Sequence, residues 1–541
     1  MQSISKYWPL IIALIILWLT VALFLIFSLR RNNGYLVYAL DDPYIHMAIA
    51  KNFVQHGVWG VSRYEFSSSS SSLLWTFILS IIYFLFGVNE VSPLILNILF
   101  ATATVVLLYG ILNKHKSSFS PIHIFLVLLA IIFLTPLPAL IFTGMEHILQ
   151  ILITNLFVYL SAKILSQSRF STITFNSISL LLLGPLVTLI RYEGLFLIFV
   201  VCVLFILQKQ YRYSFLLGVF AVIPIIIYGV ISKANGWCWF PNSILLKSNF
   251  HGLGLTSVKS IIEFLGYSSY SQLFANHHVL SIVITALLFY ILRFKEYGIW
   301  ENRQIMIIIF VATTFLHMQF AKTGWFYRYE AYLVTLGLLV IFKISFEHLQ
   351  RGILNIKTDV SKYAAIVILA FFFIKPLSSR GFFALIEIPT AINDRYIEHI
   401  YPARFVVKYY DNETIVANDI GALSYYTNSK ILDMYGLGSK EPMILRKKQA
   451  GYTKFDVFDW TRSKLAKIAI LQIQWSEISP RIPDKWIKVG EWQISRNIVF
   501  KDTKLGFYAI DPSEEKNLIS NLKQFSSQVP VNVKQCGKYI E

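Results

Sequence analysis

Long apolar runs separated by short polar segments fill the first two thirds of the chain. The first run, "YWPLIIALIILWLTVALFLIFSL" (7–29), exceeds the roughly 20 residues that cross a bilayer. Because "SLRRNNG" offers no small-residue cleavage site after it, we interpret this run as an uncleaved anchor. Further runs lie near 93–112, 121–135, 146–162, 172–190, 194–208, 214–232, 279–293, 304–321, 328–345 and 363–377. The pattern predicts a polytopic α-helical membrane protein with about 11 spans.

Charge between the runs predicts the orientation. Lys and Arg gather in alternate loops, which favours a cytoplasmic N-terminus and an outer C-terminus, although Arg30 and Arg31 break the rule. This assignment requires that "LLWTFILSIIYFLFG" (73–87) does not cross; it is short for a span and is read as an interfacial or re-entrant helix. Residues 29–92 then form the first outer loop.

The pattern changes after residue 377. Residues 378–541 alternate polar with apolar positions and contain strand-like pieces such as "ETIVAND", "KIAILQI" and "WIKVGEWQI". We therefore expect a transmembrane module over 1–377 and an extracytoplasmic α/β or α+β domain over 378–541. A disulfide between Cys238 and Cys536, both on the outer side, is one alternative for these two thiols.

Composition supports a membrane protein and argues against nucleic acid as a partner. The chain is 56% hydrophobic and 14% charged, whereas soluble domains average roughly 25% charged residues. The net charge of +18 is that of many nucleic-acid-binding proteins, but the basic residues lie mostly between apolar runs and report topology. No nucleic-acid partner is expected.

Polar side chains gather at the outer ends of the runs. An ionised group beside an apolar run is costly and is usually functional, so we expect a shared polar cavity at the outer membrane face. The candidates are Asp41, Asp42, His46, Glu146, Arg191, Glu193, Trp239, Asn242, Lys322, Tyr327, Arg328 and Glu330.

The chemistry of these groups suits transfer from a lipid-linked sugar. Carboxylates can take a proton from a hydroxyl nucleophile, and arginines beside aromatic rings can hold a phosphate and a sugar. No Gly-rich nucleotide loop is present. Nucleotides are not supplied outside the membrane, so an activated sugar would arrive on a polyprenyl phosphate.

An anchor followed by "DDPYIHMAIAKNF" resembles the GT-C glycosyltransferases, including protein O-mannosyltransferases, transferases of aminoarabinose to lipid A, and actinobacterial arabinofuranosyltransferases. Similar short patterns are "FSSSSSSLLW", "TGMEHILQIL", "LIRYEGLFL", "FPNSILLKS", "YRYEAYLVTLGLL" and "ANDIGALSYYTNSKILDMYGLG". Ser72 departs from the proline that relatives often carry there. The resemblance implies an inverting glycosyltransferase of the bacterial inner membrane, with a polyprenyl-phosphate sugar as donor and a glycan, lipid or protein as acceptor.

The resemblance also implies that Asp41 is the general base. A neighbour of like charge raises the pKa of a carboxyl, and one member of the pair can stay ionised as the base. Asp42 would then orient the acceptor or hold a cation. The alternative is that both residues cap the helix that begins near Pro43. Asp42 and His46 lie four residues apart, so they either share a divalent cation or form a hydrogen bond. No cofactor is otherwise expected.

The remaining candidates have weaker assignments. Arg191 and Arg328, with Lys322 behind them, are candidates for the donor phosphate; the alternative is ion pairing with Glu193 or Glu330. Glu146, Glu193, Tyr327, Trp239 and Asn242 complete the expected substrate site. The serine run 67–72 either contacts a sugar or is a flexible linker. Asp419 and Asp433 either bind an acceptor or serve turns.

Two other classes stay open at this point. An envelope polysaccharide polymerase or ligase also uses outer arginines and lipid-linked sugars, but it need not carry the Asp-Asp loop. A secondary transporter would place charges at mid-membrane in broken helices, often in two related halves, which the sequence does not display.

Overall fold

The computed structural model describes residues 4–114, 120–167, 174–247, 269–294, 298–350, 360–446, 452–494, 497–499 and 502–540. It divides into two compact units, each described here by itself. The helical unit comprises residues 1–24, 94–227 and 247–386. The sheet unit comprises residues 25–93, 228–246 and 387–541, so it combines the expected first outer loop with the C-terminal part of the chain.

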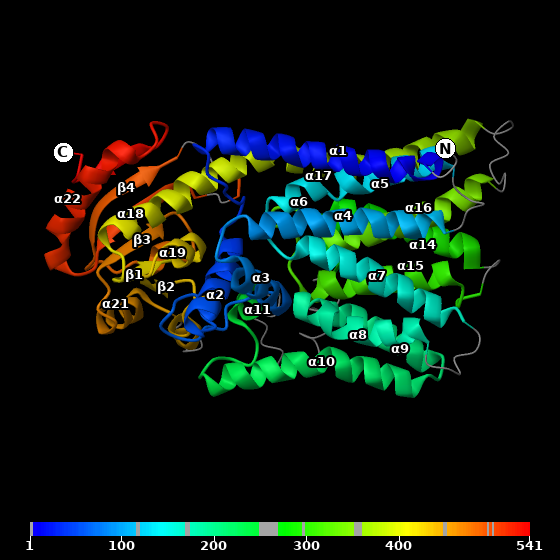
Figure 1. The fold of residues 1–541 in the computed structure, drawn as a ribbon, viewed down its shortest axis with the longest axis horizontal. Helices are drawn as coiled ribbons and strands as arrows, with labels where there is room; N and C mark the ends of the chain where they lie inside the picture. Colours follow the sequence, from blue (N-terminus) through cyan, green and yellow to red (C-terminus); the bar gives the residue numbers. More distant parts are fainter. Residues whose placement is uncertain are drawn as a thin grey trace. The chain divides into compact units, whose positions relative to one another are not determined.

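The helical unit is a bundle. Helices α7, α15 and α16 pack against one another, and α8 lies beside both α7 and α9 (Figure 1). Their contact faces are apolar, with Phe157 and Phe310 fully buried. Its helices are α1 (Ile4–Arg31), α4 (Ser92–Asn113), α5 (Pro121–Leu134), α6 (Leu137–Ile141), α7 (His147–Leu165), α8 (Phe175–Ile190), α9 (Gly194–Leu207), α10 (Tyr211–Ala234), α13 (Ser269–Ala275), α14 (His277–Phe294), α15 (Asn302–Phe320), α16 (Ala331–Gln350) and α17 (Val360–Arg395). Helices α1, α10 and α17 end in the sheet unit, and α4 begins there.

Many of these helices suit a bilayer. Within the described residues, five helices are long and apolar enough to cross it: Tyr7–Arg31, Ser92–Asn113, His147–Leu165, Tyr211–Ala234 and Asn302–Phe320. Shorter apolar helices include Leu73–Phe86, Pro121–Leu134 and Gly194–Leu207. The expected multi-pass helical membrane protein is therefore confirmed, while the total of about 11 spans stays a prediction.

The sheet unit surrounds one six-stranded sheet. Its strands are β1 (Thr414–Ala417), β2 (Lys430–Asp433), β3 (Ile468–Gln472), β4 (Ile487–Gln493), β5 (Lys504–Ala509) and β6 (Lys534–Gly537). Its helices and turns are α2 (Asp42–His56), α3 (Leu73–Phe86), α11 (Asn242–Lys247, whose last residue belongs to the helical unit), η2 (Tyr396–Ile400), α18 (Tyr401–Tyr409), α19 (Gly421–Tyr426), α20 (Glu441–Leu445), α21 (Lys454–Ser463), η3 (Ser479–Arg481), η4 (Pro512–Glu514), α22 (Glu515–Phe525) and η5 (Ser526–Gln528).

The strand order is β2-β1-β3-β5-β4-β6. Strands β2, β1 and β3 are parallel, whereas β5, β4 and β6 pair antiparallel. The three expected strand pieces are confirmed as β1, β3 and β4. From β1 the chain passes to β2 on one side and returns to β3 on the other. The carboxyl ends of β1 and β3 therefore form a switch point, where open α/β sheets commonly bind ligands.

The serine run is packed, contrary to the flexible-linker hypothesis. Ser67, Ser68, Ser69, Ser70 and Ser72 are buried. Buried hydroxyls need partners, and Ser72 provides one by accepting the Trp75 N–H as N-cap of α3. The run is thus a fixed part of the sheet unit.

The three cysteines are free thiols. The disulfide alternative for Cys238 and Cys536 is therefore not realised in the structure.

Candidate active site

Asp41 lies at the start of α2, but its side chain does not cap that helix. Its carboxylate instead accepts the N–H groups of Gly421 (2.5 Å, at Oδ2) and Ala422 (2.9 Å, at Oδ1), the first two residues of α19. The capping alternative is therefore wrong for Asp41 and its own helix. The carboxylate is only 7% exposed, so these N–H donors replace the water that it has lost.

The approach of Asp41 to α19 leaves no room for a side chain at residue 421. A Cβ built on Gly421 would lie 2.2 Å from the Asp41 carbonyl oxygen and 2.7 Å from its Oδ2. Since Cβ atoms do not come that close, glycine is required there by the contact. The pairing of α2 with α19 is thus set by the position of Asp41.

A histidine completes the surroundings of Asp41. His399 Nδ1 lies 3.2 Å from Asp41 Oδ1, and His399 Nε2 lies 3.5 Å from Asp419 Oδ2. Arg395 Nη1 lies 2.5 Å from the same Nε2. The His399 ring therefore lies between Asp41 and Asp419, with the Arg395 guanidinium beside its Nε2.

His399 belongs to the π-helical turn η2, in which the N–H of Tyr401 bonds to the Tyr396 carbonyl, five residues back. Pro402 accounts for the turn, because it has no N–H to continue the α-helical pattern. π-Helical turns are rare in proteins, and those that do occur are often found at functional sites. This one brings both Glu398 and His399 to the site.

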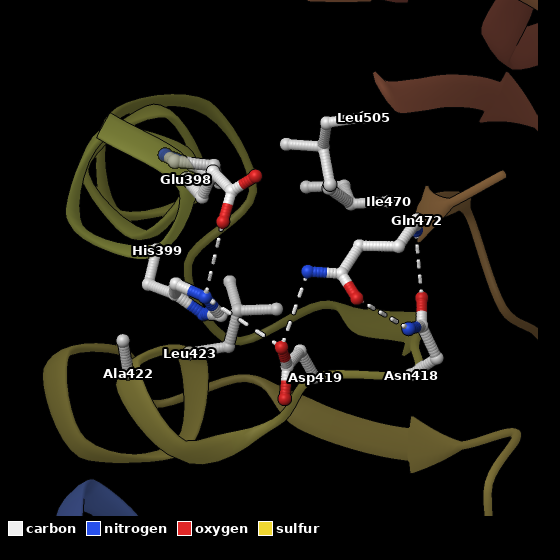
Figure 2. A pocket seen from close by; sticks show the side chains of 10 residues that line it. Glu398, His399, Asn418, Asp419, Ala422, Leu423, Ile470, Gln472 and Leu505 are labelled. Atoms are coloured by element: carbon white, nitrogen blue, oxygen red, sulfur yellow. Dashed lines mark hydrogen bonds and ion pairs between the residues drawn. The ribbon is translucent and has the colours of Figure 1, made fainter. Parts of the chain in front are cut away.

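A cavity of about 10 Å³ adjoins this histidine, which is about the room that one water needs. Its lining includes residues of η2, of α19, and of the carboxyl ends of β1 and β3, which are the switch point of the sheet. Figure 2 shows the Asp419 carboxylate directed toward His399 and the Gln472 amide. The lining residues are Glu398, His399, Pro402, Asn418, Asp419, Ala422, Leu423, Ile470, Gln472 and Leu505.

The pKa values of the two aspartates are shifted in opposite directions. Burial alone raises the pKa of Asp41, but the His399 interactions and the two N–H groups outweigh it and leave that pKa below its usual range. Burial, followed by the charge of Asp41, holds the pKa of Asp419 well above its usual range. The sequence left one member of the Asp41–Asp42 pair ionised as the base, and Asp41 is the one whose pKa is lowered. The carboxyl whose pKa is raised is Asp419.

Burial also dominates the pKa shifts of the other ionisable groups beside the cavity. Burial raises the pKa of Glu398 to about 7, against the opposing charge of Arg395. Burial also lowers the pKa of His399, although Asp41 opposes this. At neutral pH the histidine is thus uncharged, and Asp41 carries the negative charge beside it.

A divalent cation fits this group poorly. Among the described residues, Asp41, His399 and Asp419 offer ligand atoms within 4.8 Å of one another. However, Arg395 Nη1 lies 2.5 Å from His399 Nε2 and 3.9 Å from Asp419 Oδ2, so a fixed cation already fills this position. We derive no chemical step through a metal.

The expected pair Asp42 and His46 is not part of that group. Asp42 is the first residue of α2. His46 is buried, with Nδ1 2.7 Å from Thr76 Oγ1 and Nε2 3.3 Å from Ser71 Oγ. Hydroxyl groups from α3 and the serine run thus take up both ring nitrogens, and a cation at this pair stays a prediction.

Two further candidates belong to the sheet unit. Asn242 is buried; its N–H donates to the Ser68 carbonyl (2.8 Å) and its Nδ2 to the Gly436 carbonyl (2.7 Å). Trp239 is 39% exposed and covers Gly229, where a Cβ would lie 2.7 Å from the indole. These contacts give Asn242 a packing role, and the indole keeps an exposed face.

Asp433 serves a turn. Its carboxylate accepts the N–H groups of Tyr435 and Gly438. The turn alternative therefore accounts for Asp433, whereas Asp419 belongs to the cavity.

A second polar cluster lies in the helical unit. Arg191 follows α8 and forms a two-point ion pair with Glu193 (2.7 and 3.2 Å) and a third bond to Glu146 (2.8 Å). Its guanidinium lies 5.2 Å from the Tyr329 ring, and that of Arg328 lies 5.0 Å from the same ring. The structure thus brings together Arg191, Glu193, Glu146 and Arg328.

The neighbouring loop is strained. Gly324, Trp325, Phe326 and Tyr327 all have positive φ (78°, 42°, 59° and 62°), which L side chains rarely adopt. Glu330 fixes the turn by accepting the Gly324 N–H (2.8 Å). Consecutive strained residues persist only where their surroundings over-determine them, and they cluster at functional sites.

The remaining sequence candidates, Lys322, Tyr327 and Glu330, lie in or beside the same loop. Arg380 donates to the Tyr327 carbonyl and to Glu330 Oε1 (3.3 Å), while His278 Nε2 lies 3.2 Å from the same oxygen. Glu330 therefore pairs with Arg380. Lys322 is exposed.

Sequence reasoning missed His399 and Arg395, and left Asp419 as an acceptor or turn residue. The stretch "NDRYIEH" (393–399) carried the available signal, since two acidic residues, an arginine and a histidine fall within seven residues of the C-terminal part. Nothing in the sequence shows that the stretch meets Asp41.

The comparisons with known proteins agree with the fold. The structure matches the oligosaccharyltransferase of Archaeoglobus fulgidus in its apo form, with a TM-score of 0.51 and 10% identity over 98% of this chain and 76% of that one. It also matches ArnT of Cupriavidus metallidurans bound to undecaprenyl phosphate, with a TM-score of 0.50 and 11% identity over 92% of this chain and 98% of that one. Both are GT-C proteins, so the chain has the GT-C fold.

The sequence comparisons match a smaller part of the chain than the structural comparisons do. A family model described as a domain of unknown function (DUF8728) matches residues 393–508, which include Asp394 to His399 and Asp419. No curated protein matches the sequence.

Proposed function

We propose that the protein is an inverting glycosyltransferase that moves a sugar from a polyprenyl phosphate to a hydroxyl acceptor on the outer face of a bacterial inner membrane. One observation carries the proposal: in a chain with the GT-C fold, the buried Asp41 carboxylate accepts two backbone N–H groups and lies 3.2 Å from His399 Nδ1. ArnT, a neighbour of this fold, binds undecaprenyl phosphate, which supports a carrier of that class.

In the proposed reaction Asp41 takes the proton of the acceptor hydroxyl. The acceptor oxygen forms a bond to the anomeric carbon while the bond from that carbon to the phosphate oxygen breaks. The polyprenyl phosphate leaves with the electron pair, and the anomeric configuration inverts. A positioned base contributes roughly 10²–10⁴-fold to such a step.

The arginines of the helical unit are proposed to bind the donor phosphate. A guanidinium offers a planar fork that matches phosphate oxygens. The charge of Arg191 is already shared by two carboxylates, so its replacement would also affect stability. Arg328, whose guanidinium lies beside the Tyr329 ring, is proposed as the phosphate ligand. The identities of the donor sugar and of the acceptor, whether glycan, lipid or protein, are left to experiment.

The test uses purified protein with undecaprenyl phosphates that carry arabinofuranose, mannose or aminoarabinose, and octyl glycoside acceptors. We expect one donor to give a glycosylated product of inverted configuration and free undecaprenyl phosphate. Asp41→Asn keeps the shape of the side chain but removes the base, so turnover should fall by roughly 10²–10⁴-fold while donor binding persists. Full activity of Asp41→Asn would remove the base assignment.

A further inference from the structure

We propose that His399 is a positioning residue for Asp41. With its tautomer fixed by Arg395, it donates its Nδ1–H to the Asp41 carboxylate and holds that carboxylate in the orientation in which it receives a proton. The inference rests on the proposed function, and it extends the site to two residues that have no counterpart in the motifs of the sequence.

The tautomer follows from the partner of Nε2. Arg395 Nη1 lies 2.5 Å from this nitrogen. A guanidinium only donates hydrogen bonds, so Nε2 must accept and cannot carry a hydrogen. The neutral ring then has its hydrogen on Nδ1, which lies 3.2 Å from Asp41 Oδ1. The buried surroundings of His399 favour this uncharged form.

Arg395 is itself held in place. Its Nη2 lies 2.8 Å from Glu398 Oε2 and donates to Asn497 Oδ1 at 2.7 Å. Asn497 in turn donates to both oxygens of Glu398 (2.8 and 2.9 Å). A closed set of hydrogen bonds therefore keeps the guanidinium against Nε2, and the ring cannot take the other tautomer without breaking it.

The contacts of Asp41 define what is left for a substrate. An ionised carboxylate has about four lone-pair positions. Ala422 and His399 take two on Oδ1, and Gly421 takes one on Oδ2. Among the contacts of the described residues, one position on Oδ2 has no donor, and we propose that it receives the acceptor hydroxyl. Because the three donors fix the plane of the carboxylate, losing one of them frees it to turn away from the productive direction.

The experiment compares two substitutions of His399 in the full-length purified protein, with the undecaprenyl-phosphate sugar that supports transfer. His399→Leu keeps bulk and removes the donor, and we expect kcat to fall about 10- to 100-fold, as for the loss of a hydrogen bond to a charged group. KM for the donor should stay unchanged. His399→Asn should recover most of the loss, because its Nδ2 takes the place of the ring Nδ1. His56→Leu, an exposed histidine of the same helix as Asp42, is the control and should behave as wild type.

Several results would overturn the proposal. Equal losses in His399→Leu and His399→Asn would reduce His399 to bulk, and a change in KM rather than kcat would make it a binding residue. Activity that chelation abolishes and Mn²⁺ restores in wild type, but not in His399→Asn, would make it a metal ligand instead.

A stability measurement separates this proposal from the proposed function. Thermal unfolding of Asp41→Asn, His399→Leu and the double variant should show losses that are not additive, since the two side chains share one contact. Additive losses would refute the pairing even if the enzyme is active. No transfer from any donor, with coupled unfolding, would refute the function and leave the contact.

Discussion

At the scale of single residues, Asp41 is fixed by its environment more than by its neighbour in sequence. The carboxylate belongs to α2, yet its partners are Gly421, Ala422 and His399, more than 350 residues away along the chain. Its low pKa makes it a weak base at equilibrium. Catalysis by such a group depends on orientation, which the three N–H donors supply.

Gly421 provides the sharpest test of that orientation. We expect Gly421→Ala to push Asp41 away, because the new methyl group would overlap its carbonyl and carboxylate oxygens. Misplacement on this scale can cost about 10²-fold in turnover, measured as release of undecaprenyl phosphate. Gly110→Ala in α4, with open space around the new Cβ, should leave activity unchanged. An active Gly421→Ala would mean that the position of Asp41 is unimportant.

The two arginines of the helical unit should respond differently to replacement by lysine. Arg191→Lys breaks a two-point ion pair with Glu193, so we expect a lower unfolding temperature. Arg328→Lys loses the planar fork proposed to bind phosphate, so we expect weaker binding of undecaprenyl phosphate in a titration.

The result for Arg328→Lys decides the phosphate assignment. Unchanged affinity in that variant, beside a loss in Arg191→Lys, would reverse the two roles. Unchanged affinity in both would make the arginines structural.

At the scale of elements, the periodicity of apolar residues predicted the helices and strands whose formation depends on local sequence. The long apolar runs became helices, and the pieces around β1, β3 and β4 became strands. The π turn η2 was not predictable, because Pro402 explains its pattern of hydrogen bonds only once a helix is known to continue through it. The contact of Asp41 with α19 is tertiary and leaves no trace in periodicity.

In the turn Gly324–Tyr327, three residues other than glycine adopt the left-handed backbone conformation that glycine prefers. At ordinary helical positions glycine is less stable than alanine by roughly 0.5–1 kcal/mol. At Trp325, with φ of 42°, we expect the reverse: Trp325→Gly should be more stable than Trp325→Ala by about 1 kcal/mol, since only alanine pays for the left-handed conformation.

Thermal unfolding of the two variants measures the difference, and both lose the same indole. The pair Phe199→Gly and Phe199→Ala, at an exposed position of α9, is the control and should show the ordinary order. The ordinary order at Trp325 would mean that the turn is not strained there.

At the scale of the whole molecule, the sheet unit constrains the topology. It contains the ends of α1, α10 and α17 and the start of α4. We therefore expect these helix ends to lie on one side of the membrane, together with Asp41 and the C-terminal residues. Helices α1 and α10 are among those long enough to cross, so we expect their first residues on the opposite side.

This gives a prediction in two steps. Reporters fused at Arg212, near the start of α10, and at the C-terminus should lie on opposite sides of the membrane, whichever way the protein is inserted. The basic residues of alternate loops then set the direction: Arg212 should be cytoplasmic and the C-terminus outside. Paired fusions to alkaline phosphatase, active outside, and to a fluorescent protein that folds only inside, measure both.

The two steps fail differently. Reporters on the same side would mean that α10 does not cross, and the division of the chain between the two faces would have to be redrawn. Opposite sides in the reversed direction would place Asp41 in the cytoplasm, where nucleotide sugars are available. A lipid-linked donor would then lose its physical reason, because the need for a polyprenyl carrier follows from the absence of nucleotides outside the membrane.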